Sequence, residues 1–405
     1  MSIYERDRWY HFFVVLYINA RIIVDIVRII ARFYMPSLIN QIENTRDALY
    51  IICAIYVVYL FFKYGINKID IIFWVGSAVA FGVSLLISPQ ISSFISYVIM
   101  LFYSRILVGM VFFEHLTDYK KVIHIQLFFL LPTLIDAILM FSVEQTDGYM
   151  ALSYNLMPSA LFYMFYGLQN KKWLFSLSGI VIFFVTFIYG ARGAVACGCA
   201  AVIIYMIVAF IRQSSKITIG NIAFFSTVLI VMILVYVNWN NIIFFLSEQF
   251  GTSRTLSFIT SENVLSDSNR QITFDAMEAA IAESPILPNG LLADRFICAE
   301  IKNLSVGPSA YPHNYIYEII YQFGIPLGCL FLLWNIRLII RWFVKLKYAN
   351  SNFMFVTISF VPLAFIQLMV SNSYLLNYVW GIAMGILLSE YNSKKTKRQG
   401  LETSI

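Results

Sequence analysis

The sequence PSAYPHNYIYE, from Pro308 to Glu318, marks the point where the chain changes character. Residues 239–313, which end within this stretch, form one long polar segment, and the residues that follow the stretch are strongly apolar. Pro312 suits the start of a helix, so a helix is expected to begin beside His313. The charged side chains of the polar segment include Arg254, Glu262, Arg270, Asp275, Glu278, Glu283, Asp294, Arg295, Glu300 and Lys302. One large hydrophilic loop in an otherwise oily chain is the expected place for chemistry on a water-soluble group.

The composition around this segment is that of a membrane protein. The chain has 405 residues, of which 60% are hydrophobic and 12% charged, and its mean hydropathy is +0.76. Soluble domains carry about 25% charged residues. Apolar runs recur along the chain, and at about 20 residues each they fit membrane-spanning helices. The net charge of +6 comes mainly from short loops and does not indicate nucleic-acid binding.

The predicted fold is all-α, a polytopic membrane protein with about 12 transmembrane helices and one large periplasmic loop. Residues 1–238 hold the first nine helices, 239–313 the loop with short helices, 314–390 the last three helices, and 391–405 a basic tail. The predicted helices cover residues 10–34, 48–62, 71–87, 91–113, 122–141, 149–166, 173–189, 194–211, 217–237, 314–340, 353–370 and 374–389. The first helix carries Arg21, Asp25 and Arg28, which either pair with other helices or mark an interfacial helix.

Loop charges predict the orientation of these helices. Positively charged loops stay on the cytoplasmic side. With a cytoplasmic N-terminus, the short outer loops hold only Arg46 and Arg192, and both termini and most basic residues lie inside. The basic residues assigned to the cytoplasmic side are Arg6, Arg8, Lys63, Lys68, Lys120, Lys121, Lys171, Lys172, Arg212, Lys216, Arg341, Lys345, Lys347, Lys394, Lys395, Lys397 and Arg398. The large loop then lies on the outer side of the membrane, as Arg192 does.

Inside the loop, one helix is predicted from Ser266-Asp267-Ser268 to Pro285. Its expected apolar stripe contains Ile272, Ala276, Ala279 and Ala280. Arg270 would lie in its first turn, where unpaired backbone N–H groups and the helix dipole favour an anion.

Two further residues are candidates for chemistry. Arg192 lies in a tight turn with Gly193 between apolar helices, and is either an interfacial arginine reaching lipid phosphate or a guanidinium that binds a diphosphate in bidentate fashion. His313 is either a structural residue or a general base, since its ordinary pKa of about 6.5 suits proton abstraction at neutral pH. Asn314 and Glu318, four residues apart, would share one helix face, so that Glu318 could orient neighbouring polar groups. No metal-ligand spacing and no cofactor motif are found.

These residues together resemble the bacterial O-antigen polymerases of the Wzy type and the related O-antigen ligases. Ala191-Arg192-Gly193 is similar to the family's Ser-Arg-Gly turn, with Ala in place of Ser. Arg270 with the following helix and Pro285–Gly290 is similar to its loop helix and Pro-x-x-Gly-x-Gly turn, with Pro288 in place of the first Gly. His313-Asn314, Glu318, Gly324 and Gly328 resemble its His-Asn helix, and residues 149–158 resemble a stretch common in polymerases.

The resemblance implies an inverting, metal-independent glycosyltransferase. Its donor and acceptor would be glycans on undecaprenyl diphosphate, with a chain-length regulator as a possible partner besides membrane lipids. Arg192 and Arg270 would bind the diphosphate, His313 would be the base, and Gly193, Arg254, Arg295, Asn314 and Glu318 would support them. Two alternatives stay open: a ligase that transfers glycan to lipid A core, and a flippase or transporter for the same lipid.

Overall fold

The computed structural model describes residues 2–35, 47–139, 149–189, 192–213 and 268–389. Within these ranges the chain is helical and contains no strand. The α-helices are α1 (Tyr10–Tyr34), α3 (Ala48–Tyr64), α4 (Lys68–Ile87), α5 (Ile95–Leu101), α6 (Val108–Glu114), α7 (Tyr119–Leu127), α8 (Leu130–Leu139), α9 (Tyr149–Asn170), α10 (Trp173–Tyr189), α11 (Arg192–Gln213), α15 (Ser268–Glu283), α16 (Asp294–Ile301), α17 (Tyr315–Leu346) and α18 (Ser351–Val370), followed by a final helix, Tyr378–Ser389. A 3-10 turn, Pro89–Ser93, precedes α5, and a π-helical turn, Phe102–Leu107, joins α5 to α6.

Among the described residues, five helical stretches are long and apolar enough to cross a membrane, counting α5, the π-helical turn and α6 as the one stretch Ile95–Glu114. The bent pair α7 and α8 makes a sixth if it counts as one span. The prediction of a helical membrane protein is confirmed at this level. The predicted count of about 12 spans and the periplasmic position of the loop stay predictions. The predicted helix over 217–237 lies outside the described residues.

Most predicted helices have a structural counterpart, with three differences in shape. The predicted helix over 91–113 is divided into α5, a π-helical turn and α6. The predicted helix over 122–141 is bent by 53° between α7 and α8. The predicted helix over 314–340 extends to Leu346 and is broken at Gly324, whose φ of 73° is not helical.

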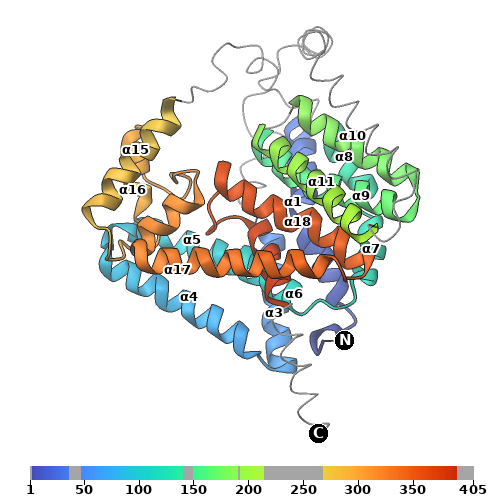
Figure 1. Cartoon of the computed structure of the whole chain (residues 1–405), viewed down its shortest axis with the longest axis horizontal. Coiled ribbons are helices and arrows are strands. Elements are labelled where there is room, and N and C mark those ends of the chain that lie inside the picture. The colour runs from blue at the N-terminus through green and yellow to red at the C-terminus, as the bar shows by residue number, and fades with distance from the viewer. Residues whose placement is uncertain (1, 36–46, 140–148, 190–191, 214–267, 390–405) are drawn as a thin grey trace.

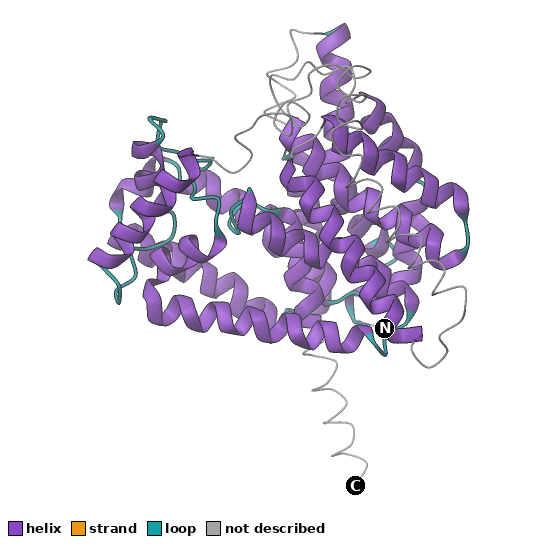
Figure 2. Cartoon of the chain, turned by 45° about the horizontal axis from the view of Figure 1, so that its top comes forward, coloured by secondary structure: helices purple, strands orange, loops and turns teal. Residues whose placement is uncertain are grey.

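The helices form a packed bundle with two long helices along one side. In Figure 1, α9, α10 and α11 lie together on one side of α1 and α18, while α4 and α17 both extend towards α15 and α16. In Figure 2, which turns the view of Figure 1, the end of the molecule that holds α15 and α16 again lies to one side of the bundle. The final helix, α18 and much of α9 are buried in the core.

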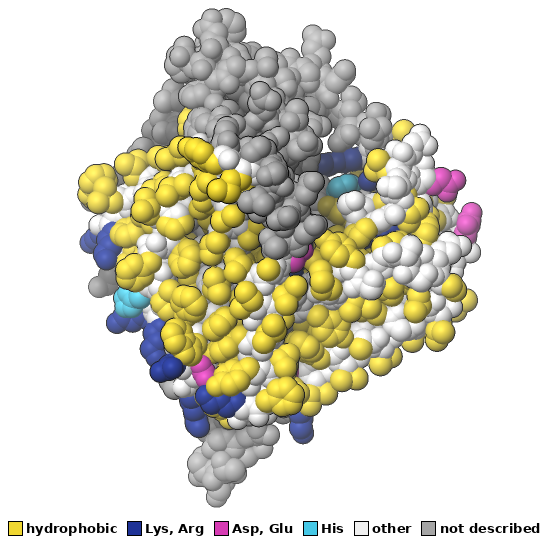
Figure 3. All heavy atoms as spheres, turned by 180° about the vertical axis from the view of Figure 1, so that it is seen from behind, with side chains coloured by type: hydrophobic (Ala, Val, Ile, Leu, Met, Phe, Trp, Pro, Cys, Tyr) yellow, Lys and Arg dark blue, Asp and Glu magenta, His cyan; other side chains and the backbone are white. Residues whose placement is uncertain are grey.

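The outer faces of α4 and α17 are apolar and exposed. Leu86 is 82% exposed and Leu330 is 64% exposed. Figure 3 shows one broad hydrophobic face with Lys and Arg side chains along an edge. An apolar surface of this kind on several helices fits contact with lipid.

Polar residues of the first helix pair inside the bundle. Arg21 Nη2 lies 3.8 Å from Asp47 Oδ1. Asp25 accepts a hydrogen bond of 2.8 Å from the Asn155 side chain. The interpretation of internal pairing is therefore confirmed for Arg21 and Asp25.

The turn after α15 is anchored on the break in α17. The Ile325 N–H donates to the Pro285 carbonyl at 2.8 Å, and the Gly290 N–H donates to the Gln322 carbonyl at 3.1 Å. A Cβ atom on Gly324 would overlap the Ile286 carbonyl, so this close approach requires glycine. On the other side, Ser84 of α4 accepts a hydrogen bond from the Leu291 N–H at 2.7 Å. The turn is thus fixed between α4 and α17.

Candidate active site

His313 occupies a strained position just before α17. Its φ is 57°, in the left-handed region. Non-glycine residues adopt this region rarely, although histidine does so more often than most, and strained positions cluster at functional sites. The next residue, Asn314, caps α17 by accepting hydrogen bonds from the Ile316 and Tyr317 N–H groups at 2.9 and 3.4 Å. Asn314 therefore fixes the helix start, which differs from the predicted sharing of a helix face with Glu318.

The imidazole of His313 is held by aromatic packing and leaves one nitrogen available. Its ring centroid lies 4.5 Å from that of Tyr311. Tyr311 in turn donates a hydrogen bond of 2.9 Å to the Ser371 carbonyl at the end of α18. The Nδ1 atom of His313 is buried and has no hydrogen-bond partner among the described residues. A nitrogen in this state can accept a proton or bind a ligand hydroxyl.

Positive charge surrounds this imidazole. Burial, followed by the charges of Lys302 and Arg270, lowers the pKa of His313 to about 4; Arg295 adds to the effect and the Ser371 carbonyl opposes it. His313 is therefore neutral at pH 7, the form that a general base requires.

The predicted loop helix places Arg270 at this site. Its bounds agree with the prediction, and Arg270 is the third residue of α15. α15 packs on α17 where the Phe274 and Tyr317 rings lie 5.3 Å apart and Tyr317 hydrogen bonds to Glu278. The predicted apolar stripe is wrong for two of its four residues: Ile272 is 52% exposed and Ala279 is exposed, whereas Thr273 and Met277 are buried.

The N-terminus of α11 reaches the same region through Tyr154. A Cβ atom on Gly193 would overlap the Tyr154 hydroxyl. Tyr154 lies within the electrostatic range of Arg270, as His313 does, and is next to the Ser371 side chain. Arg192 begins α11, so its backbone lies in this region, while its side chain is outside the described part of the structure. Arg254 also lies outside the described residues.

A network of buried ion pairs and hydrogen bonds supports the site. Arg295 is fully buried and pairs with Asp294 and, at 2.9 Å, with Glu318. It also donates to Ser373 at 2.8 Å, and its guanidinium carbon lies 5.3 Å from the Tyr311 ring centroid. Burial works to lower the pKa of Arg295, but Asp294 and Glu318 outweigh it and hold the pKa above its usual range. Arg295 and Glu318 thus hold Tyr311, and through it His313, and do not face a ligand themselves.

Several residues of this network are not predicted from the sequence. Asp294 and Gln322 form a hydrogen bond of 2.6 Å, and Ser373 donates to Glu318 at 2.5 Å. Ser371 and Ser373 lie in a short polar turn, Ser371-Asn372-Ser373, between two apolar helices. That interruption is the one sequence feature that could have indicated them.

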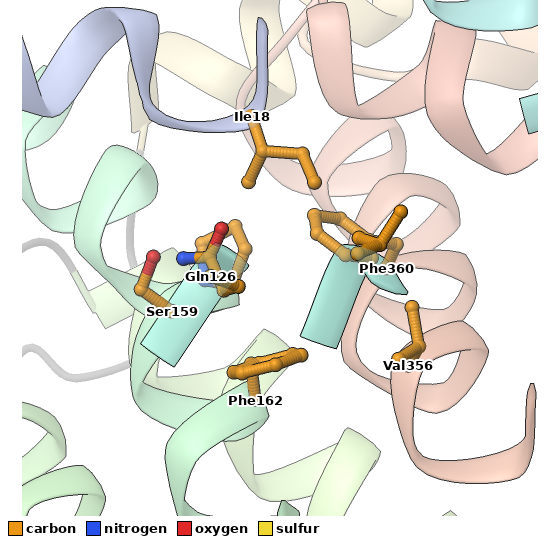
Figure 4. Close-up of a pocket in the computed structure, with 8 residues that line it drawn as sticks. Ile18, Gln126, Ser159, Phe162, Val356 and Phe360 are labelled. Atoms are coloured by element: carbon orange, nitrogen blue, oxygen red, sulfur yellow. The ribbon is translucent and has the colours of Figure 1, made fainter. Parts of the chain in front are cut away.

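A small pocket in the bundle is a poor match for a charged ligand. Its lining residues are Ile18, Val122, Gln126, Pro158, Ser159, Phe162, Val356 and Phe360. Figure 4 shows Gln126 and Ser159 as the polar groups among apolar side chains. With no cationic residue in its lining, the pocket does not suit a diphosphate.

One group of described residues could hold a metal ion. Asp70, Glu114 and His115 each offer a ligand atom, all within 4.8 Å of one another. His115 Nε2 lies 3.0 Å from Asp70 Oδ2, and Asn67 donates to Glu114 at 3.3 Å. These hydrogen bonds already satisfy much of the group. No interaction among the described residues joins this group to His313.

Comparison with known proteins identifies no relative. No family model, no curated protein and no solved structure matches this chain. What the protein does is therefore inferred from its residues and their arrangement.

Proposed function

We propose that the protein is a membrane-embedded glycosyltransferase that polymerises oligosaccharide repeat units carried on undecaprenyl diphosphate. The product would be O-antigen or capsular polysaccharide, made at the periplasmic face of the inner membrane. The observation that carries the proposal is the position of His313. Its backbone is in the left-handed region, its imidazole is neutral, and its Nδ1 has no hydrogen-bond partner among the described residues, while the charge of Arg270 acts on the ring.

His313 is proposed as the general base that takes the proton of the acceptor hydroxyl. A pKa of about 4 makes a weak base in the empty site. A bound diphosphate would add negative charge beside Arg270 and Lys302 and raise the pKa of His313 towards neutrality. The base would then gain strength when the donor is bound.

Arg270 and Arg192 are proposed to bind the diphosphate leaving group. A diphosphate gains negative charge as the glycosidic bond breaks, and fixed guanidinium groups stabilise that charge. The first turn of α15 adds backbone N–H groups at Arg270. The lipid tail would lie against the apolar helices.

A conservative substitution tests the arginine roles. Lysine keeps the charge but not the planar fork, so Arg192→Lys and Arg270→Lys should each lose most of the polymerisation activity in purified protein. Arg337→Lys, at an exposed position of α17, is the control and should keep it. Full activity in both site variants would refute the diphosphate role.

Deletion of the gene tests the reaction itself. Loss of a polymerase should leave lipid A core that carries a single repeat unit, because ligation continues. Loss of a ligase should leave bare core and long polymer on undecaprenyl diphosphate. An unchanged glycolipid ladder on a gel would exclude both roles for that glycan and leave capsule as the product to examine.

A further inference from the structure

Tyr154 places a buried hydroxyl against the start of α11. The residue is 7% exposed, and its hydroxyl has no hydrogen-bond partner among the described residues, although the Ser371 side chain is a neighbour. Buried hydroxyl groups are nearly always paired. A buried donor that has no partner among the described residues is therefore placed to bind a ligand.

The hydroxyl is directed at the first turn of α11. Gly193 is the second residue of this helix, and any Cβ atom there would overlap the Tyr154 oxygen. The first N–H groups of a helix have no partner within the helix, and the helix dipole makes this end positive. Glycine leaves the backbone open to approach, so a ligand can contact both the N–H groups and the hydroxyl.

The charge around this position selects an anion. Arg270 exerts its charge on Tyr154 as it does on His313. A phenol donor, a helix N-terminus and a guanidinium group together match the oxygen atoms of a phosphate.

We propose that the Tyr154 hydroxyl and the first turn of α11 at Gly193 form a subsite for one phosphate group of the lipid-linked diphosphate. This inference rests on the proposed function, and it adds a neutral hydrogen-bond donor to the two arginines. In this arrangement Tyr154 donates to a phosphate oxygen, and Arg270 binds the neighbouring phosphate.

Binding of undecaprenyl diphosphate to the full chain in detergent micelles is the test. Tyr154→Phe should weaken binding roughly 10- to 100-fold, since a hydrogen bond to a charged group is lost, and should leave the thermal unfolding temperature unchanged. The control is Tyr205→Phe, a buried tyrosine of α11 whose ring stacks on Phe165 at 4.2 Å, which should bind as the wild type does. Wild-type affinity in Tyr154→Phe would overturn the subsite.

Variants at Gly193 separate the effect of the Tyr154 hydroxyl on ligand binding from its effect on packing. Gly193→Ala should lower both affinity and unfolding temperature, because its Cβ displaces the Tyr154 hydroxyl. Adding Tyr154→Phe removes the overlapping oxygen, so the double variant should recover its unfolding temperature but not its affinity. Recovery of wild-type affinity in the double variant would show that the hydroxyl acts only by its bulk, against the proposal.

Three further outcomes identify the ligand and separate the subsite from the proposed function. Phosphatidylglycerol should not compete with undecaprenyl diphosphate; equal competition would assign the subsite to an ordinary phospholipid head group and overturn the diphosphate assignment. If wild-type protein does not bind undecaprenyl diphosphate at all, the proposed function fails. If it binds and Tyr154→Phe binds equally well, only the subsite fails.

Discussion

Mild acid should destabilise this protein through His313. The pKa of the imidazole is lowered from 6.5 to about 4 in the folded protein, chiefly by burial and then by Lys302 and Arg270. Between these two values the unfolded chain binds a proton that the folded protein does not. The stability contributed by the neutral ring is therefore fully present above pH 6.5 and is lost as the pH falls towards 4.

The size of the effect follows from the two pKa values. Going from pH 7.5 to pH 5, proton binding to the unfolded chain should lower the free energy of unfolding by about 2 kcal/mol. Other groups titrate in the same range, so the effect is measured as a difference from a variant. His313→Asn is suitable because asparagine tolerates the left-handed backbone and does not titrate.

The assay is unfolding in detergent micelles at both pH values, with wild type and His313→Asn in parallel. The wild type should lose about 2 kcal/mol more than the variant. His313→Gly, which also relieves the strain at a φ of 57°, should follow the asparagine variant in its pH dependence. A wild-type-minus-variant difference that is the same at both pH values would refute the lowered pKa and the buried, neutral state of the ring.

Three other predictions concern topology, the ion network and the break in α17. A cysteine at residue 261 should react with a membrane-impermeant label added from outside the inner membrane and one at residue 395 should not; the opposite pattern would invert the proposed orientation. Arg295→Met leaves buried carboxylates unpaired, so thermal unfolding should show a loss of roughly 3–5 kcal/mol, and a loss below about 1 kcal/mol would contradict the network. Gly324→Ala should cost at least about 1–2 kcal/mol from backbone strain alone, whereas Gly76→Ala, with open space around it, should cost nothing in the same measurement.

Helices and their approximate limits are readable from the sequence, because apolar periodicity and caps are local properties. The helix that carries Arg270 is an example: Ser268 begins it and Pro285 follows its end. The proximity of Arg270 and His313 could be expected only from the resemblance to a family, since 42 residues separate them along the chain (313 − 270 − 1).

The support around these residues could not be predicted in the same way. Arg295 is one of several charged loop residues, and its burial depends on Glu318 and Ser373, which lie far along the chain. The left-handed backbone of His313 depends on Pro312, Asn314 and the packing of Tyr311 together. Tyr154 belongs to an apolar helix, where an unpaired hydroxyl is invisible until its neighbours are known.

The break at Gly324 has a consequence for the depth of the site in the proposed membrane arrangement. Residues 325–346 beyond the break would extend for about 33 Å at the usual rise of a helix, close to the thickness of a bilayer's hydrocarbon core, about 30 Å. If the longer arm spans the hydrocarbon, the shorter arm of α17 that His313 precedes would project into the layer of lipid head groups. The diphosphate of the proposed lipid-linked donor would lie in that layer, so the length of one helical arm would set the site at the depth of the proposed substrate. In bilayers with longer acyl chains, the depth of the site would no longer match the depth of the diphosphate. Activity in reconstituted membranes should therefore show an optimum in lipid chain length.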